Sequence, residues 1–294
     1  MKLNKIFLFG VMALSLMFAA SCSDDDDYAP GKPAGSYNVS FPEEQPNGND
    51  IVLTPEAKSF KAVIRRANGA GELTVPIKKL AATDAIFSLP ESVTFANGET
   101  KKEIDVTCDE SMEMFKTYNC YINIPEEYTQ PYSTGTASDI ASPNLHFSVI
   151  KEDFVLWGTG KWDNSEWCEA PTIFDVNVEY SEIKKLYRIK QFYGYGSGTS
   201  TIFFKWNGEA YTYSDEDKDP AFCFTDENGE LLSSKLNLGE SSSTYGPIYF
   251  SWVNDDPDSP TEITADGKIS FYFEYTVSAG SFGACQEILQ LKKN

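Results

Sequence analysis

The stretch Val93-Thr94-Phe95-Ala96-Asn97-Gly98-Glu99, followed closely by Ile104-Asp105-Val106, has the pattern of two short strands connected by a turn. Apolar residues alternate with polar ones on both sides of the turn, and this period of two is typical of a strand with one buried face. Similar short strands recur from Tyr37 to about Ile150. Short strands separated by turns at regular intervals predict a β-sandwich.

Motifs on either side of this stretch also resemble a Calx-beta domain, which is an immunoglobulin-like sandwich. They are Val39-Ser40-Phe41, the strand-turn-strand segment around Arg65, and the closing Val149-Ile150-Lys151-Glu152-Asp153. The resemblance covers residues 37–153. It implies that this half of the chain is a single sandwich domain.

In some Calx-beta domains, acidic loop residues bind calcium, and the matching acids here are Asp109, Glu110, Glu152 and Asp153. The aspartate-rich central loop of the family is replaced by Ala82-Thr83-Asp84-Ala85. Ca²⁺ needs about six to eight oxygen ligands, and this replacement removes some of the ligands that the family's loop would supply. We therefore interpret these acids as solvated loop residues first and calcium ligands second, and expect no bound metal.

The composition changes near Phe154, and all five tryptophans follow it: Trp157, Trp162, Trp167, Trp206 and Trp252. Strand-like runs from Ile173 to Leu291 alternate with loops rich in Gly, Ser, Asn and Asp. Trp157-Gly158-Thr159-Gly160-Lys161-Trp162 and Leu186-Tyr187-Arg188-Ile189 resemble C-terminal domains of uncharacterised Bacteroidetes lipoproteins. The expected fold class is all-β: an immunoglobulin-like β-sandwich over 37–153, followed by a second antiparallel β-sandwich or barrel-like domain over 154–294.

The N-terminus has the parts of a secretory signal peptide in order. Lys2 and Lys5 are basic, Ile6 to Phe18 is mostly apolar, and three small residues precede Cys22. Ala20-Ser21-Cys22 resembles a bacterial lipobox, which implies removal of residues 1–21 and acylation of Cys22, with palmitate among the chains. An ordinary signal peptide with a chance cysteine is the alternative.

Ser23 and four aspartates, Asp24, Asp25, Asp26 and Asp27, follow this cysteine. They resemble the export signal of Bacteroidetes surface lipoproteins, which implies a lipid-anchored protein of the cell outer membrane that faces the extracellular side. The alternative is a solvated acidic linker, because like charges in a run repel one another. Residues 22–36 are rich in Asp, Pro and Gly and predict a disordered tether.

The chain is strongly acidic, with 24 basic and 44 acidic residues and a formal net charge of −20 at pH 7. Its field repels nucleic acid and anionic lipid headgroups, so neither is an expected partner. A carbohydrate or an outer-membrane protein remains as a partner, and the lipid anchor is the expected membrane contact. The single histidine, His146, argues against zinc sites and against Ser-His-Asp chemistry unless it is the base. No cofactor is expected.

Five cysteines follow Cys22, namely Cys108, Cys120, Cys168, Cys223 and Cys285. An export route permits disulfides, but an odd number leaves at least one thiol unpaired. Cys108 and Cys120 flank one expected hairpin and are the candidates for a bridge. Buried free thiols are the alternative, because cysteines are common in cores.

Aromatic residues of the second domain are the main functional lead. A sugar ring has a face of C–H groups that packs on a flat aromatic ring, while its hydroxyls need amides or carboxylates. The candidate ligand-binding residues are Trp157, Trp162, Trp167, Asp163, Asn164, Tyr193, Tyr195 and Tyr245. Trp206, Tyr249 and Trp252 alternate within expected strands and are interpreted as core residues.

Together these features predict a non-catalytic, glycan-binding surface lipoprotein. The alternative from another class is a structural or adhesion lipoprotein that binds a protein partner. A glycoside hydrolase is the third possibility, but its two carboxylates cannot be picked out of 44 acidic residues. No catalytic residue is therefore assigned.

Overall fold

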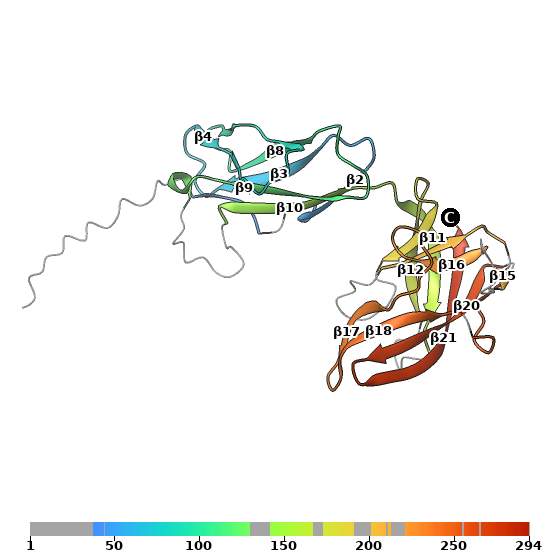
Figure 1. The fold of residues 1–294 in the computed structure, drawn as a ribbon. Coiled ribbons are helices and arrows are strands. Elements are labelled where there is room, and N and C mark those ends of the chain that lie inside the picture. The colour runs from blue at the N-terminus through green and yellow to red at the C-terminus, as the bar shows by residue number, and fades with distance from the viewer. Residues whose placement is uncertain are drawn as a thin grey trace, which may run out of the picture. The chain divides into compact units, whose positions relative to one another are not determined.

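The computed structural model describes residues 38–43, 45–129, 142–166, 173–190, 201–209, 211–212, 221–254, 256–264 and 266–293. Its elements are β-strands and one 3-10 turn, η1 (Glu126–Tyr128), so the expected all-β fold class is confirmed (Figure 1). The chain divides into two compact units between Lys151 and Glu152, close to the change of composition at Phe154. In the described part of the chain, no helix is long and apolar enough to cross a membrane.

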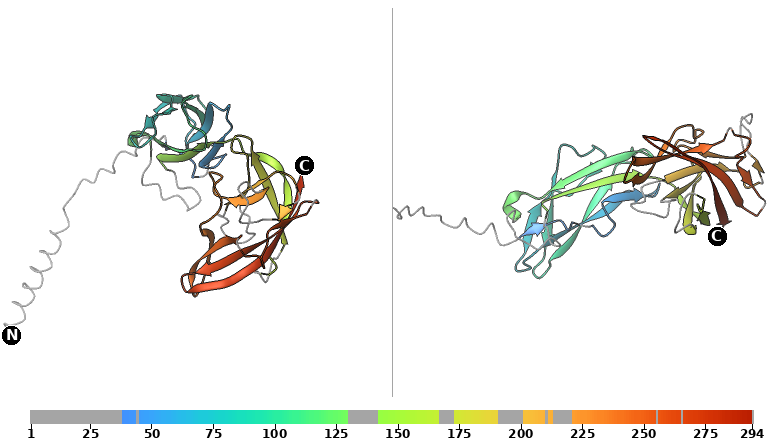
Figure 2. Two further views of the ribbon diagram at one scale, coloured as in Figure 1. Left: turned by 45° about the vertical axis from the view of Figure 1, so that its right-hand side comes forward. Right: turned by 90° about the horizontal axis from the view of Figure 1, so that it is seen from below.

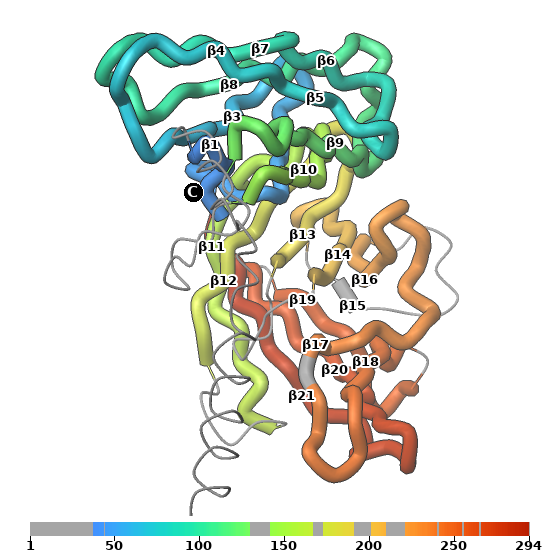
Figure 3. Tube along the Cα trace, turned by 90° about the vertical axis from the view of Figure 1, so that its left-hand side faces the viewer, coloured from blue at the N-terminus to red at the C-terminus, as the bar shows by residue number. Residues whose placement is uncertain are grey.

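Unit 1 is a two-layered sandwich. Four strands form one sheet in the order β1-β3-β8-β6, four form a second in the order β2-β10-β9-β5, and β4 pairs with β7. The strands of unit 1 can be followed in Figure 2 and Figure 3. Their bounds are β1 (Val39–Ser40), β2 (Asp50–Leu53), β3 (Ser59–Arg66), β4 (Leu73–Pro76), β5 (Lys78–Lys79), β6 (Phe87–Ser88), β7 (Ser92–Phe95), β8 (Lys101–Cys108), β9 (Thr117–Asn123) and β10 (Asn144–Lys151).

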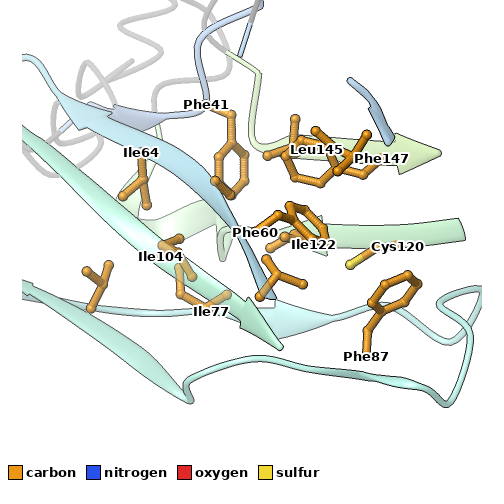
Figure 4. Packing of buried hydrophobic residues seen from close by; sticks show 14 of the residues in the cluster. Phe41, Phe60, Ile64, Ile77, Phe87, Ile104, Cys120, Ile122, Leu145 and Phe147 are labelled. Carbon is orange, nitrogen blue, oxygen red and sulfur yellow. The ribbon is translucent and has the colours of Figure 1, made fainter. Parts of the chain in front are cut away.

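The core of unit 1 consists of aliphatic and phenylalanine side chains from both sheets. Alternation decides which residues enter it: along β8, Ile104, Val106 and Cys108 are buried while the residues between them are exposed. Phe60 of β3 packs edge-on against Phe147 of β10, with ring centroids 4.9 Å apart, and Figure 4 shows these rings within the cluster. This contact joins the two sheets face to face.

The turn at residues 96–99 connects two different sheets. β7 pairs with β4, whereas β8 pairs with β3 and β6. The buried Arg66 holds this turn, because its Nε donates to the carbonyl of Glu99 and its Nη2 donates to the carbonyl of Ala96, at 2.7 and 2.8 Å. Gly98 has φ +88°, a conformation that favours glycine.

Cys108 and Cys120 are both buried free thiols. The expected bridge is therefore not formed, and the buried-thiol alternative is confirmed for this pair. Burial, with a smaller contribution from Cys108, raises the pKa of Cys120 to about 12. A thiol that stays protonated at neutral pH acts as a small apolar side chain in this core.

Unit 2 contains one large antiparallel sheet, with the order β15-β19-β20-β21-β11-β12-β13-β14-β16 and with β17 and β18 joined through β20. Its most prominent feature is the long hairpin of β20 and β21, red in Figure 2. The bounds are β11 (Val155–Asp163), β12 (Ile173–Ser181), β13 (Leu186–Lys190), β14 (Thr201–Trp206), β15 (Tyr211–Thr212), β16 (Phe222–Thr225), β17 (Leu236–Ser242), β18 (Gly246–Val253), β19 (Glu262–Ile263), β20 (Lys268–Val277) and β21 (Gly280–Lys293).

This sheet curls into a half-barrel around an aromatic core. Phe224 lies on β16 at one end of the strand order, yet its ring contacts Phe271 of β20 and Trp252 of β18, with centroids 4.9 and 5.4 Å apart. Such contacts require the sheet to fold back on itself. The expectation of a barrel-like second domain is thus confirmed.

Candidate functional site

Trp162 is part of the core of unit 2, and its expected place on an exposed loop is wrong. It lies within β11 and is 0% exposed, as is Asn164 just after the strand. The indole N–H of Trp162 donates to Oε2 of Glu287 at 2.5 Å. Neither Trp162 nor Asn164 reaches solvent, so neither can contact a ligand in this conformation.

Glu287, the hydrogen-bond partner of Trp162, is not among the site residues predicted from the sequence. It is 0% exposed, and its Oε1 also accepts a hydrogen bond from the hydroxyl of Tyr275. Burial raises the pKa of this carboxyl to about 7, although the hydrogen bonds from Tyr275 and Trp162 act in the opposite direction. The alternating pattern of β21 places Glu287 on the same buried face as Leu289. This alternation is the sequence feature that could have indicated the burial of Glu287.

Trp157 lies at a β-bulge, where β11 and β12 shift register between Leu156 and Gly158. It is half-buried, and its ring packs edge-on against Tyr187 and Trp206, with centroids 5.3 and 6.4 Å apart. A bulge re-aims the side chain at the extra residue. Here it turns Trp157 towards the edge of the core, which leaves only part of its ring accessible.

Three exposed aromatic residues of unit 2, Tyr245, Tyr249 and Phe282, are together called the tip patch; their exposed fractions are 46%, 37% and 47%. Tyr245 lies in the turn before β18, and its ring centroid is 6.5 Å from that of Phe282 near the start of β21. The interpretation of Tyr249 as a core residue is wrong, because β18 turns Phe250 and Trp252 inward and Tyr249 outward. The tip patch is therefore an aromatic surface of unit 2.

An open groove of about 520 Å³, here called the outer groove, adjoins the tip patch. Its floor includes Ser251, Glu274 and Ala284, which lie side by side on β18, β20 and β21. Its remaining lining residues come mostly from the segment before β17 and the end of β18: Leu231, Leu232, Ser233, Lys235, Trp252, Val253 and Asn254.

Two observations connect the groove with the patch. Tyr249 shares the outward face of β18 with Ser251, because they are two residues apart on one strand. Tyr249 also lies directly opposite Thr276, whose hydroxyl accepts a hydrogen bond from Nζ of Lys235 at 3.1 Å. The outer groove and the tip patch thus form one continuous surface with rings at one end and polar groups at the other.

Several predicted site residues lie outside the described residues. They are Cys22, Ser23, Asp24, Asp25, Asp26 and Asp27 of the leader junction and Trp167, Tyr193 and Tyr195 of the second domain. Asp163 is described; its Oδ1 accepts a hydrogen bond from the backbone N–H of Ser165 at 3.0 Å and so serves a local turn. Of the predicted ligand-binding residues that the structure describes, only Tyr245 lies in the candidate site, and Trp157 is half-buried elsewhere.

The acids that match the calcium positions of Calx-beta domains have other partners. Glu152 is buried and pairs with Arg188, so its interpretation as a solvated loop residue is wrong. Asp153 accepts hydrogen bonds from Ser181 and from the backbone of Ile183. Glu110 pairs with a lysine, and Asp109 accepts from the backbone of the following turn. Among the described residues, no three His, Cys, Asp or Glu side chains are grouped to hold a metal ion.

His146 is exposed on β10. Its ring stacks on Tyr121, with centroids 4.2 Å apart, and its Nε2 lies 2.9 Å from Oδ1 of Asn119. A base for Ser-His-Asp chemistry needs a serine nucleophile and a carboxylate as partners, and these contacts supply neither. His146 thus packs on Tyr121 at the surface of unit 1.

The search against protein-family models and the search of curated proteins found no match. Among solved structures, a Bacteroides ovatus protein of unknown function is 10% identical, with 86% of this chain and 89% of that chain covered and a TM-score of 0.36. The apo form of the Calx CBD1 domain is 10% identical over 40% of this chain and 98% of its own length, with a TM-score of 0.28.

A third solved structure, from Bacteroides ovatus, has a provisional carbohydrate-binding assignment. It is 8% identical to this chain, covers 85% of it and 79% of its own length, and has a TM-score of 0.29. At these identities and scores, the three likenesses support no functional conclusion.

Proposed function

We propose that this protein is a non-catalytic glycan-binding protein and that its second unit binds the sugar along the outer groove, with the tip patch as an aromatic platform. The main support is the adjacency of exposed rings and polar groups on one face of unit 2. Sugars require both kinds of contact at once, because their ring faces are apolar and their hydroxyls are polar. The groove volume of about 520 Å³ also fits a small-molecule site.

The groove favours binding over catalysis. Glycoside hydrolysis uses two carboxylates about 5 to 9.5 Å apart. Glu274 is the one carboxylate among the residues that line the groove in the described part of the chain. A second acid at the required separation is absent from that lining, so the proposed role is recognition.

We further propose that a lipid on Cys22 anchors the protein in the outer membrane and that Asp24 to Asp27 direct it to the outer face. The support is the sequence order of a basic, an apolar and a small-residue segment before Cys22. Metabolic labelling with a palmitate analogue should mark the wild type and not Cys22→Ala. Replacing the four aspartates with alanine should keep the label and reduce protease accessibility on whole cells; unchanged accessibility would reduce the acidic run to a linker.

Glycan binding is tested with the mature full-length chain on a glycan array and by affinity electrophoresis against neutral polysaccharides. Tyr249→Ala should weaken the affinity about tenfold, because it removes one stacking ring. Ile183→Ala is the matched control, since Ile183 is an exposed apolar residue of unit 2 that lies outside the groove lining and the tip patch. Absence of binding to every glycan, together with capture of a stoichiometric outer-membrane protein, would favour the adhesion alternative instead.

A further inference from the structure

The Glu274 carboxylate occupies the middle of the outer groove floor. In the register of the sheet, Ser251 lies opposite it on one side and Ala284 lies opposite it on the other. Both neighbours have small side chains, so they leave space above the strand on both sides of the carboxylate. A ligand can therefore approach both oxygens of Glu274 from the groove.

This carboxylate is also unpartnered. In the described part of the chain, no donor hydrogen-bonds to it and no lysine or arginine forms an ion pair with it. The cation of the groove, Lys235, instead donates to the hydroxyl of Thr276 at 3.1 Å. Glu274 is half-buried, so part of its hydration is lost without a protein partner in return. Two hydroxyl donors from a ligand would restore those hydrogen bonds.

We infer that Glu274 binds a vicinal diol of an uncharged sugar, with each carboxylate oxygen accepting from one of two adjacent hydroxyls, and that the same carboxylate rejects acidic glycans. This inference rests on the proposed glycan binding and adds its chemical class. An ionised carboxylate is an acceptor only, so hydroxyl donors suit it and a uronate or sulfate does not. The formal net charge of −20 acts in the same direction, because it repels anionic polymers before contact.

The first test compares three forms of the mature full-length protein by affinity electrophoresis: wild type, Glu274→Gln and the control Glu262→Gln. Glu262 is an exposed acid on β19 outside the groove lining. The probes are galactomannan, xyloglucan, mixed-linkage β-glucan and yeast mannan as neutral polymers, and polygalacturonate and heparin as acidic ones. Glu274→Gln should lose at least tenfold in affinity for the neutral polymer that the wild type binds, and it should gain affinity for an acidic polymer. The control should match the wild type.

The second test addresses the diol. The hexose that competes best for the wild type is compared with its 2-deoxy, 3-deoxy and 4-deoxy forms. At least one deoxy form should compete about tenfold less well against the wild type, yet equal the parent hexose against Glu274→Ala. Wild-type binding with a Glu274→Gln affinity within twofold, or with acidic and neutral polymers bound equally, would overturn this inference alone. No wild-type binding to any probe would overturn the proposed function and this inference with it.

Discussion

The two units of this protein are both built from strands, but their cores differ in chemistry. The core of unit 1 consists mainly of aliphatic and phenylalanine side chains, and both polar atoms of the buried Gln45 amide bond to the backbone of Val63, at 2.7 and 3.2 Å. Unit 2 encloses aromatic rings together with a fully buried carboxyl, Glu287. In unit 2 the buried ionisable groups bond to other side chains, as in the pair of Arg188 with Glu152, whereas the buried Arg66 of unit 1 bonds to backbone carbonyls.

The largest expected effect comes from Trp162→Ala. It leaves a cavity and removes a hydrogen bond from Glu287, so we expect a loss of about 5 kcal/mol from the stability of unit 2. Phe147→Ala, at an equally buried ring of unit 1, should cost about 3 to 4 kcal/mol because no polar group loses a partner. Hydrogen exchange of the full chain in denaturant assigns each loss to its unit. Equal losses of stability in the two units would contradict the proposed difference between their cores.

The second prediction compares the stability lost when each of two buried arginines is removed, Arg188 in unit 2 and Arg66 in unit 1. Nη1 of Arg188 donates to Glu152 at 2.7 Å, and its Nε donates to Glu179 at 2.6 Å. Arg188→Ala leaves the buried Glu152 carboxylate with the more distant Lys190, whose Nζ lies 3.8 Å away, and should cost about 3 to 4 kcal/mol. Arg66 in unit 1 bonds to backbone carbonyls, so Arg66→Ala should cost about 2 to 3 kcal/mol.

The double variant Arg188→Met with Glu152→Met is the control for the pair, because it removes both charges. It should be less destabilising than Arg188→Ala by at least 1 kcal/mol in denaturant titrations. A double variant as unstable as Arg188→Ala would show that packing, and not the stranded charge, is responsible.

The third effect is on pH dependence. The pKa of Glu287 is raised from 4.5 to about 7, so the folded state holds an extra proton between these values and the stability of unit 2 falls as pH rises through about 7. Each unit of pKa corresponds to about 1.4 kcal/mol, so this shift gives a loss of about 3 to 4 kcal/mol. In unit 1 the pKa of Cys120 is raised from 9.0 to about 12, so its corresponding loss occurs only in alkaline solution.

Melting curves from pH 5 to 8 check this contrast. Glu287→Gln should remove the slope of unit 2 in that range, because glutamine does not titrate. A slope that persists in Glu287→Gln would assign the pH dependence to another group.

The smallest effect concerns two glycines. A Cβ on Gly158 would lie 2.4 Å from the carbonyl oxygen of Lys292 on the paired β21, so Gly158→Ala should destabilise unit 2 by about 2 kcal/mol through overpacking. Gly98 of unit 1 has open space around it but φ +88°, so Gly98→Ala should cost about 1 kcal/mol through backbone conformation. Thermal denaturation measures both, and a larger cost at Gly98 would contradict this ranking.

Much of the architecture could be predicted from local patterns. Alternation indicated the strands, and the change of composition near Phe154, with all five tryptophans after it, indicated a second domain. The site was predicted only in part: Tyr245 lies in the tip patch, whereas Trp162 is in the core and Tyr249 is on the surface. Glu274 had no local signal, because it is one acid among 44 and its groove comes from three strands.

The acidic character of the chain, its strands with a period of two and the larger share of aromatic residues in its second half all follow from the amino-acid sequence. Which face of each strand is buried depends on how the sheets pack. The reason is that a period of two places alternate residues on one face without specifying what covers that face. Trp162 is inside because Glu287, 125 residues away, and the curled sheet close over it, and Glu274 faces a groove because Ser251 and Ala284 on neighbouring strands are small.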